Sequence, residues 1–211
     1  VLLLIIIEFL VWNMDNKEIF SRENLTRCGL SAALRAYQSG DFKKAIKHWI
    51  PLAEEGNIEA QNHLGYLYAY GIDFKDQNGK SIMNFKTAMK WYTLSAEQGD
   101  PEGQTHLATR FKYMWNPQKP FWTSQYVRKA IKWYTAAAKQ GYAEAQFKLG
   151  EMYGEGRAVK QDYKIKFYWW SLAAERGHAE AQNDLGLMYS QGRGVPRNEE
   201  IAVKWFTLSA K

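Results

Sequence analysis

The chain has 211 residues, of which 46% are hydrophobic and 15% aromatic, so it can fill the core of one domain or one repeat array and lacks the composition of a disordered protein. Its net charge of +6 mildly favours acidic partners, but 28 basic residues against 22 acidic ones do not indicate nucleic-acid binding. The single cysteine excludes an internal disulfide and a zinc site built on cysteine pairs.

Residues 1–13 are an apolar leader or a segment upstream of the natural protein. The run is too short to span a bilayer, which takes about 20 residues, so no stable membrane insertion is expected. Glu8 interrupts it and no basic residue precedes it, which leaves three interpretations open: a clipped export signal, a membrane-proximal anchor and residues outside the natural protein. Residues 14–26 are polar, and a start at Met14 would make the protein cytoplasmic, whereas an export signal would make it periplasmic or secreted.

Two blocks of sequence alternate along the rest of the chain. The first has the pattern Ala-Gln-x-x-Leu-Gly-x-x-Tyr, with small changes, at 60–68, 103–111, 145–153 and 181–189. The second has an Ala-x-Lys-Trp-Tyr pattern, also with changes, at 88–92, 130–134, 166–170 and 202–206, and an earlier copy at 45–49 has no full first block before it. Apolar or small residues recur at the spacing of one helical face, so each block predicts a helix.

Capping residues predict where the helices begin and end. Glycines that can adopt a left-handed conformation end the second helices at Gly56, Gly99, Gly141 and Gly177. N-cap residues precede the second helices at Asp41, Asn84, Asp162 and Asn198, and only Tyr126 breaks that column.

A column of small residues runs through the first blocks, at Gly65, Ala108, Gly150 and Gly186. A glycine inside a helix costs about 1 kcal/mol relative to alanine. Its repeated use predicts that the two helices of each unit approach too closely for a larger side chain.

The two blocks together resemble the Sel-one-like repeat family, a relative of the tetratricopeptide repeats, over residues 27–211. The last copy carries the family pattern most fully, with Ala179, Ala181, Gln182, Leu185, Gly186, Met188, Tyr189, Gly192, Gly194, Val195 and Trp205. The resemblance implies an all-α fold, an α/α solenoid of stacked helix-turn-helix repeats that forms a right-handed superhelix. It also implies a bacterial adaptor that assembles complexes of other proteins.

The resemblance divides the chain into units. A partial tetratricopeptide-like repeat occupies residues 27–56, and repeats follow at 57–99, 100–141 and 142–177. The final repeat, at 178–211, ends inside its second helix, so we expect either that the natural chain continues or that this helix frays.

The sequence favours a non-catalytic protein–protein interaction scaffold, with a protein or peptide as partner. It contains no nucleophile elbow, no phosphate-binding glycine loop and no His-Glu-x-x-His motif, so we assign no catalytic residue, metal site or cofactor. The alternative is a β-lactam-binding or hydrolysing enzyme like the cysteine-rich relatives of this family, although those relatives staple each repeat with a cysteine pair that this chain lacks. A nucleic-acid partner is a third hypothesis and is not expected, and the oligomeric state stays open.

Two longer connections between helices, at 69–83 and 112–125, are the first candidate binding region. They carry six aromatic residues: Tyr70, Phe74, Tyr113, Trp115, Phe121 and Trp122. Aromatic side chains on loops are favoured interface anchors. They also suit a structural role, covering the wider gap between repeats, and we favour this second interpretation slightly.

A polar column on the first helices is the second candidate. His63, His106 and Lys148 occupy it, followed by Asp184. Two histidines one repeat apart could ligate a metal, but no third or fourth ligand accompanies them, so a polar stripe along a binding groove is the favoured interpretation. Both the concave groove and the loop edge stay open as the binding region.

Overall fold

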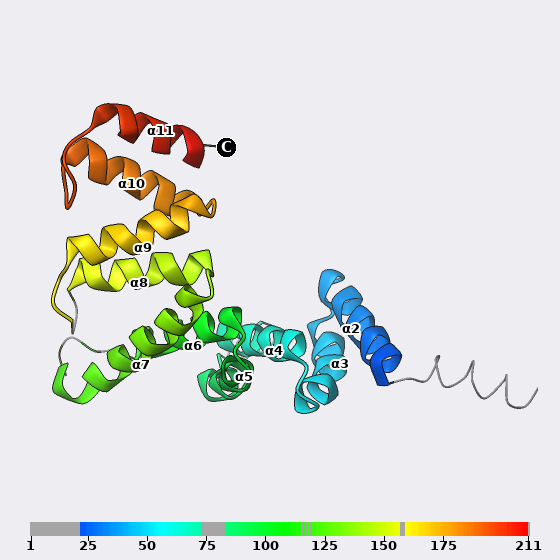
Figure 1. Cartoon of the computed structure of the whole chain (residues 1–211). Helices are drawn as coiled ribbons and strands as arrows, with labels where there is room; N and C mark the ends of the chain where they lie inside the picture. Colours follow the sequence, from blue (N-terminus) through cyan, green and yellow to red (C-terminus); the bar gives the residue numbers. More distant parts are fainter. Residues whose placement is uncertain are drawn as a thin grey trace, which may run out of the picture. The chain divides into compact units, whose positions relative to one another are not determined.

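The computed structural model of the chain describes residues 22–72, 83–114, 116, 118, 120–156 and 159–210, without the side chains of 22–25 and 120–123. This part contains ten α-helices and no strand (Figure 1). The helices are α2 (Arg22–Gln38), α3 (Phe42–Glu54), α4 (Ile58–Tyr70), α5 (Phe85–Glu97), α6 (Pro101–Tyr113), α7 (Pro120–Lys139), α8 (Ala143–Glu155), α9 (Tyr163–Glu175), α10 (Ala179–Gln191) and α11 (Glu199–Ser209). The predicted all-α solenoid is confirmed, the handedness of its superhelix stays a prediction, and the leader at 1–13 lies outside the described residues.

The chain forms two units, residues 1–91 and 92–211, and each has its own buried core. In the first unit α2, α3 and α4 pack in chain order, and Trp49 is fully buried among alanine and leucine side chains. In the second unit each helix from α6 to α11 packs against the next, and Figure 1 shows α8 to α11 side by side. Two buried clusters fill this unit, one around Tyr134 and one around Trp170.

A buried glutamine joins each repeat to the one before it. Its Nε2 donates to the backbone oxygen of an alanine at the end of the preceding second helix. The pairs are Gln61–Ala53 at 2.9 Å, Gln104–Ala96 at 3.3 Å, Gln146–Ala138 at 3.0 Å and Gln182–Ala174 at 3.0 Å. Each of these carbonyl oxygens also accepts the backbone N–H of the glycine that ends the helix, at 3.0 to 3.1 Å. The glutamine bonds to the second lone pair of the same oxygen and so acts as a connector between repeats.

The small-residue column marks close approaches in the hairpins that contain Gly150 and Gly186, as predicted. A Cβ atom on Gly150 would lie 2.4 Å from Cδ1 of Trp170, and one on Gly186 would lie 2.5 Å from Cε1 of Phe206. Where the column has Ala108, the facing aromatic residue is Tyr134, whose hydroxyl lies 2.8 Å from Oγ1 of Thr109. Burial raises the pKa of the Tyr134 phenol, so this hydroxyl is neutral and available for that hydrogen bond.

The predicted helix ends are confirmed. The four helix-ending glycines have positive φ angles, 95° at Gly56, 90° at Gly99, 86° at Gly141 and 84° at Gly177. The four predicted N-cap side chains accept backbone hydrogen bonds from the first turns of α3, α5, α9 and α11. The N-cap residues and the helix-ending glycines therefore determine where the helices of each hairpin begin and end.

The predicted long connection at 112–125 is wrong. Helix α6 continues to Tyr113 and α7 already begins at Pro120, so the two helices are separated by residues 114–119 only. Proline suits the first position of a helix because its φ angle is helical and its missing N–H has no partner to lose there. Phe121 and Trp122 therefore belong to the first turn of a longer helix. The other connection runs from 71 to 84, and its residues 73–82 lie outside the described part.

Among the described residues, no helix combines the length and the apolar character that crossing a membrane requires.

Candidate binding surface

The second unit presents one row of side chains that we call the first-helix face, because it follows α6, α8 and α10. It consists of His106, Tyr113, Lys148, Glu151, Glu155, Asp184, Leu187 and Gln191. Residues at i, i+3, i+4 and i+7 share one side of a helix, which places these positions together on each of the three helices. The buried residues of the same helices repeat from copy to copy, whereas this row changes chemistry at each step.

The two predicted histidines are each stacked on an aromatic ring of a second helix. The ring of His106 lies 4.9 Å from that of Tyr92, and its Nε2 lies 3.6 Å from Oε1 of Glu102. In the first unit the ring of His63 lies 4.4 Å from that of Trp49. Both imidazoles are therefore held in place by packing. A single stripe running from His63 to His106 would span the two units and stays a prediction.

Lys148 is the centre of an ion-pair network on α8. Its Nζ lies 3.5 Å from Oε1 of Glu144 and 3.4 Å from Oε2 of Glu151. Burial alone would lower the pKa of Lys148, but the two carboxylates outweigh it and the pKa is raised. The predicted lysine is thus fully charged and held by its own helix.

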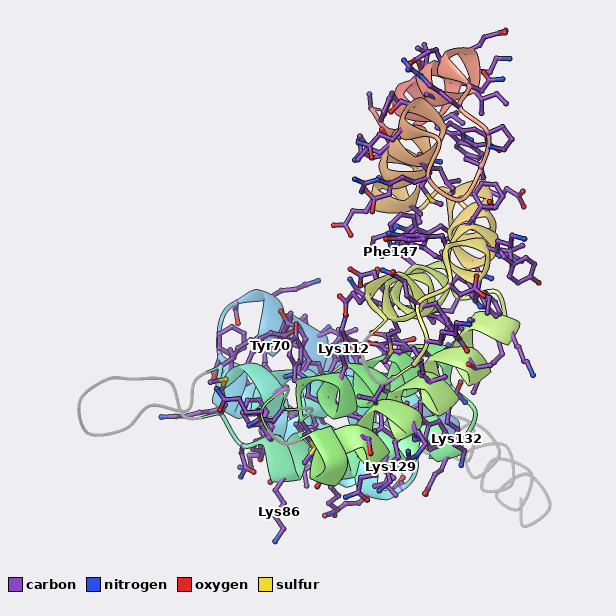
Figure 2. All side chains as sticks on the ribbon, turned by 90° about the vertical axis from the view of Figure 1, so that its left-hand side faces the viewer. Tyr70, Lys86, Lys112, Lys129, Lys132 and Phe147 are labelled. Atoms are coloured by element: carbon purple, nitrogen blue, oxygen red, sulfur yellow. The ribbon has the colours of Figure 1, made fainter. Side chains whose placement is uncertain are left out.

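The network reaches both neighbouring first helices. Lys112 of α6 lies 3.7 Å from Glu151 and 3.5 Å from Glu155, measured from its Nζ to the nearer carboxylate oxygens. At the other end, Nε2 of His178 lies 2.9 Å from Oε2 of Glu144, and this hydrogen bond lowers the pKa of the carboxyl group. In Figure 2, Lys112 of α6 is labelled above Lys129 and Lys132 of α7.

The predicted aromatic anchors are only partly described. Tyr70 closes α4 with 49% of its surface exposed, and Tyr113 closes α6 with 74% exposed. Phe74 and Trp115 lie outside the described residues, as do the side chains of Phe121 and Trp122. Exposure suits Tyr70 and Tyr113 for contact with a partner, and the binding role of the whole set stays a prediction.

The alternative prediction for the histidine column was metal ligation. In the described ranges, no three His, Cys, Asp or Glu side chains come close enough to hold a metal ion.

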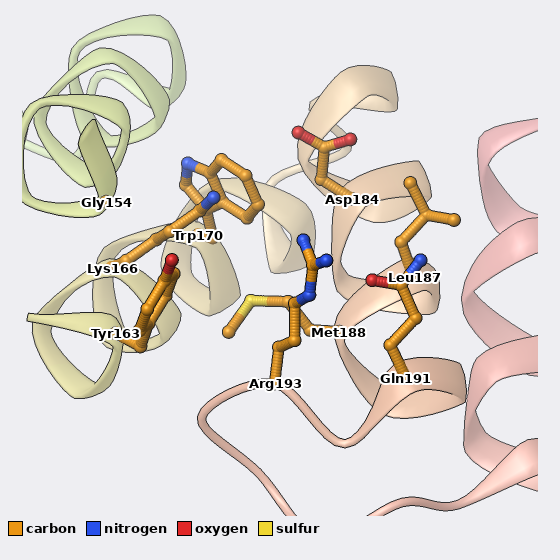
Figure 3. Close-up of a pocket in the computed structure, with 9 residues that line it drawn as sticks. All are labelled: Gly154, Tyr163, Lys166, Trp170, Asp184, Leu187, Met188, Gln191 and Arg193. Atoms are coloured by element: carbon orange, nitrogen blue, oxygen red, sulfur yellow. The ribbon is translucent and has the colours of Figure 1, made fainter.

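A pocket of about 240 Å³ between α9 and α10 was missed by the sequence reasoning. Lys166, Trp170 and Tyr163 line it from α9, and Asp184 and Leu187 line it from α10 (Figure 3). Arg193 projects into it from the loop after α10 (Figure 3).

Lys166 owes its position to two changes in the repeat. It stands where the other copies have an alanine that is buried in the hairpin, at Ala45, Ala88, Ala130 and Ala202. Gly154 makes the room, because a Cβ atom there would lie 2.4 Å from Cδ of Lys166. The ammonium group lies 3.7 Å from the centroid of the Trp170 ring, a cation–π contact. A lysine in an alanine column was therefore the sequence signal for this pocket.

Burial dominates the electrostatics of the pocket. It lowers the pKa of Lys166; Asp184 and Glu151 oppose this effect, Arg193 adds to it, and the net shift is downward. Burial likewise raises the pKa of Asp184, against the opposing effect of Lys166. The ionised forms of both groups are thus less well solvated than they would be in water.

The glycines around Arg193 fix its place in the pocket. Gly192 ends α10 with φ at 69°, and the backbone N–H of Arg193 donates to the Met188 carbonyl at 3.0 Å. Gly194 has φ at 74°, and a Cβ atom there would lie 3.0 Å from Cβ of Tyr163. The Gly-x-Gly pattern that marks the end of a first helix therefore also aims the residue between the two glycines.

Comparison with solved structures finds the same architecture in bacterial proteins. The protective antigen c5321 of uropathogenic Escherichia coli strains, which has an SLR fold, is 31% identical with a TM-score of 0.72, and the match covers 89% of this chain and 37% of that one. A Sel1 repeat protein from Oxalobacter formigenes is also 31% identical, with a TM-score of 0.64 over 84% of this chain and 68% of that one. A putative sel1 repeat protein from Klebsiella pneumoniae, at 22% identity and a TM-score of 0.52, shows the fold alone. The chain thus spans 37% of the length of the Escherichia coli antigen.

Comparison with curated proteins finds no match. The family model described as Sel1 repeat matches residues 33–57, 58–100, 127–142, 143–178 and 179–211, which is most of the chain and follows the hairpins of the structure. The chain therefore belongs to the Sel1 repeat family.

Proposed function

We propose that this chain is a non-catalytic scaffold that binds a segment of another protein along the first-helix face. Sel1 repeat proteins typically serve as scaffolds for protein–protein interaction, which supports the general role. The alternative of a β-lactam-hydrolysing enzyme gains no support from the comparisons or from the described residues.

The observation that carries the proposal is the contrast between buried and exposed columns of the repeat. The fold requires the alanine, glutamine, leucine and glycine positions, and these recur in the first helices. It does not dictate the exposed column in which His106 is followed by Lys148 and Asp184. Side chains that the fold leaves free supply the chemistry that a solenoid uses for recognition.

The exposed side chains are also held in position, which favours binding. Lys148 is fixed between two carboxylates of its own helix, and His106 is stacked on Tyr92. A partner then loses less binding free energy to the ordering of these side chains than it would on a surface of unrestrained lysines.

The test is site-specific photo-cross-linking in the cell from which the chain comes, with a benzoylphenylalanine residue at one of two positions. Leu187 lies on the first-helix face and is 41% exposed, whereas the control, Val203, lies on α11 and is 61% exposed. We expect a discrete protein adduct from position 187 that position 203 does not give, followed by direct binding of that purified protein. Equal adducts from both positions, or none from position 187, would count against the proposal.

A further inference from the structure

We propose that the pocket between α9 and α10 is a subsite for an acidic side chain, so that the partner presents a Glu or Asp carboxylate to Lys166 and Arg193. This inference rests on the proposed scaffold function and names the chemistry of the segment that the scaffold would hold.

The first argument is the state of Lys166. The comparable cation of the preceding repeat, Lys112, lies within 3.7 Å of two carboxylates, and Lys148 is paired in the same way. No carboxylate of the described residues forms such an ion pair with Lys166, whose ammonium group lies on the Trp170 ring instead. A half-buried ammonium group without a carboxylate partner gains more from an incoming anion than one already paired.

The second argument is the second cation. Figure 3 shows the Arg193 guanidinium group in the space between α9 and α10, on the same side as Lys166 and Trp170. No ion pair links Arg193 to a carboxylate within the ranges that the structure describes. Its proximity depresses the pKa of Lys166, as expected for two like charges. An anion between the two groups would remove this repulsion, and a guanidinium group can bind a carboxylate through two parallel hydrogen bonds.

The third argument selects the charge of the ligand. The pocket holds one carboxylate, Asp184, against its two cations, which leaves a single positive charge in excess. Burial is the main cause of the raised pKa of Asp184, and Glu151 and Glu180 add to it, so the carboxylates near the pocket limit how much negative charge a ligand can bring. A monoanionic carboxylate matches this balance, whereas a phosphate dianion would exceed it.

The shape of the pocket selects a side chain on a protein segment. The exposed aliphatic surface of Leu187 and the ring of Tyr163, which are 41% and 40% exposed, flank the charged groups. These surfaces can cover the methylene groups of Glu and an apolar neighbour in the same segment. Because Leu187 also belongs to the first-helix face, a segment lying along that face can place a side chain in the pocket without ending there.

The test measures the binding of labelled peptides to the whole chain by fluorescence anisotropy at fixed, low salt. The probe is an amidated peptide of seven glutamates, and an amidated peptide of seven glutamines is its neutral control. The same glutamine peptide with a free carboxyl terminus tests whether the pocket binds a chain-terminal carboxylate instead of a side-chain carboxylate. The variants are Lys166→Met, which keeps the apolar stem, and Lys164→Met, which removes an exposed charge from the same helix.

We expect the glutamate peptide to bind the wild type and Lys164→Met equally, and Lys166→Met to bind it about tenfold more weakly or worse. Equal losses in the two variants would show a diffuse charge effect and overturn the subsite. So would equal binding of the amidated glutamine peptide, or binding of the free-terminus glutamine peptide as tight as that of the glutamate peptide.

A second measurement distinguishes failure of the proposed subsite from failure of the proposed scaffold function. Acylation of Lys166 by acetic anhydride, followed by mass spectrometry, should slow when the glutamate peptide is present, while acylation of Lys164 should not. If the photo-cross-linked partner is captured equally by the wild type and Lys166→Met, the subsite fails and the scaffold stands. If position 187 captures no protein although Lys166 is protected by the peptide, the scaffold fails and the pocket keeps its carboxylate chemistry.

Discussion

The third repeat (α6 and α7) and the fourth repeat (α8 and α9) each place one lysine at corresponding positions of the hairpin, but on different helices. In the third, the cation comes from the first helix, Lys112, and the second helix carries a fully buried Ala130 at the facing position. In the fourth, the first helix has Gly154 and the cation comes from the second helix, Lys166. Lys112 is neutralised by two carboxylates of α8, whereas Lys166 lies on an aromatic ring beside a pocket. Moving a charge from one helix to its neighbour thus turns a structural ion pair into a candidate binding site.

The largest effect is expected when the lysine of the fourth repeat is copied into the third without the glycine that makes room for it. Ala130→Lys should destabilise the chain by roughly 3 kcal/mol, because the new side chain enters a filled core and faces Lys112. Lys112→Gly/Ala130→Lys should recover part of that loss by opening the space that Gly154 opens in the fourth repeat. Urea unfolding followed by circular dichroism measures both. A single variant as stable as the wild type would mean that the two positions are not equivalent.

The third and fourth repeats also differ in the small-residue column, where Gly150 faces Trp170 and Ala108 faces Tyr134. Gly150→Ala should cost about 1–2 kcal/mol, because its Cβ would lie 2.4 Å from Trp170, while the helical preference of alanine offsets part of the strain. Adding Trp170→Tyr recreates the Ala108–Tyr134 pair of the third repeat and should recover stability. A double-mutant cycle in urea tests this coupling, and additive losses would refute it.

The N-caps of the first helices differ between the third repeat and the final one. Asp100 caps α6 through a 2.7 Å bond from the Gly103 N–H, whereas His178 caps α10 by accepting at Nδ1 from the Ala181 N–H at 3.2 Å. His178→Ala should therefore cost about 1 kcal/mol of unfolding free energy. His178→Asn should cost less, because its amide oxygen can replace Nδ1. Thermal unfolding of the two variants separates the cap from the bond to Glu144, and equal losses would assign the whole effect to Glu144.

The smallest effect concerns pH. The hydrogen bond from His178 lowers the pKa of Glu144, so this carboxylate stabilises the folded chain above its unfolded pKa and loses that contribution as pH falls through its folded pKa. Glu144→Gln should cost under about 1 kcal/mol at pH 7, since the side chain is 43% exposed, and less at pH 3. Denaturant titrations at the two pH values check this. A loss that persists undiminished at pH 3 would show that the carboxylate charge is not its cause.

The sequence was sufficient for most of the fold. The hairpins could be predicted from the helical spacing of apolar residues, the capping residues and the glycine column. Each of these features acts within a few residues or between neighbouring helices. The extension of α7 to Pro120 was not predicted, because we expected residues 112–125 to form a connection. The candidate site was harder to predict. Lys166 stood out of its alanine column in the sequence, but the pocket also depends on Arg193, which two glycine conformations bring to α9 from the next repeat.

The buried glutamine bonds bear on how such a chain can grow. Each connector needs only a glutamine at the start of one hairpin and a backbone carbonyl at the end of the hairpin before it. Every residue has a backbone carbonyl group, so a duplicated repeat would bring the glutamine that bonds it to whichever repeat precedes it. Length can then change by whole repeats without redesign of the neighbours, and each new copy is free to acquire its own exposed column.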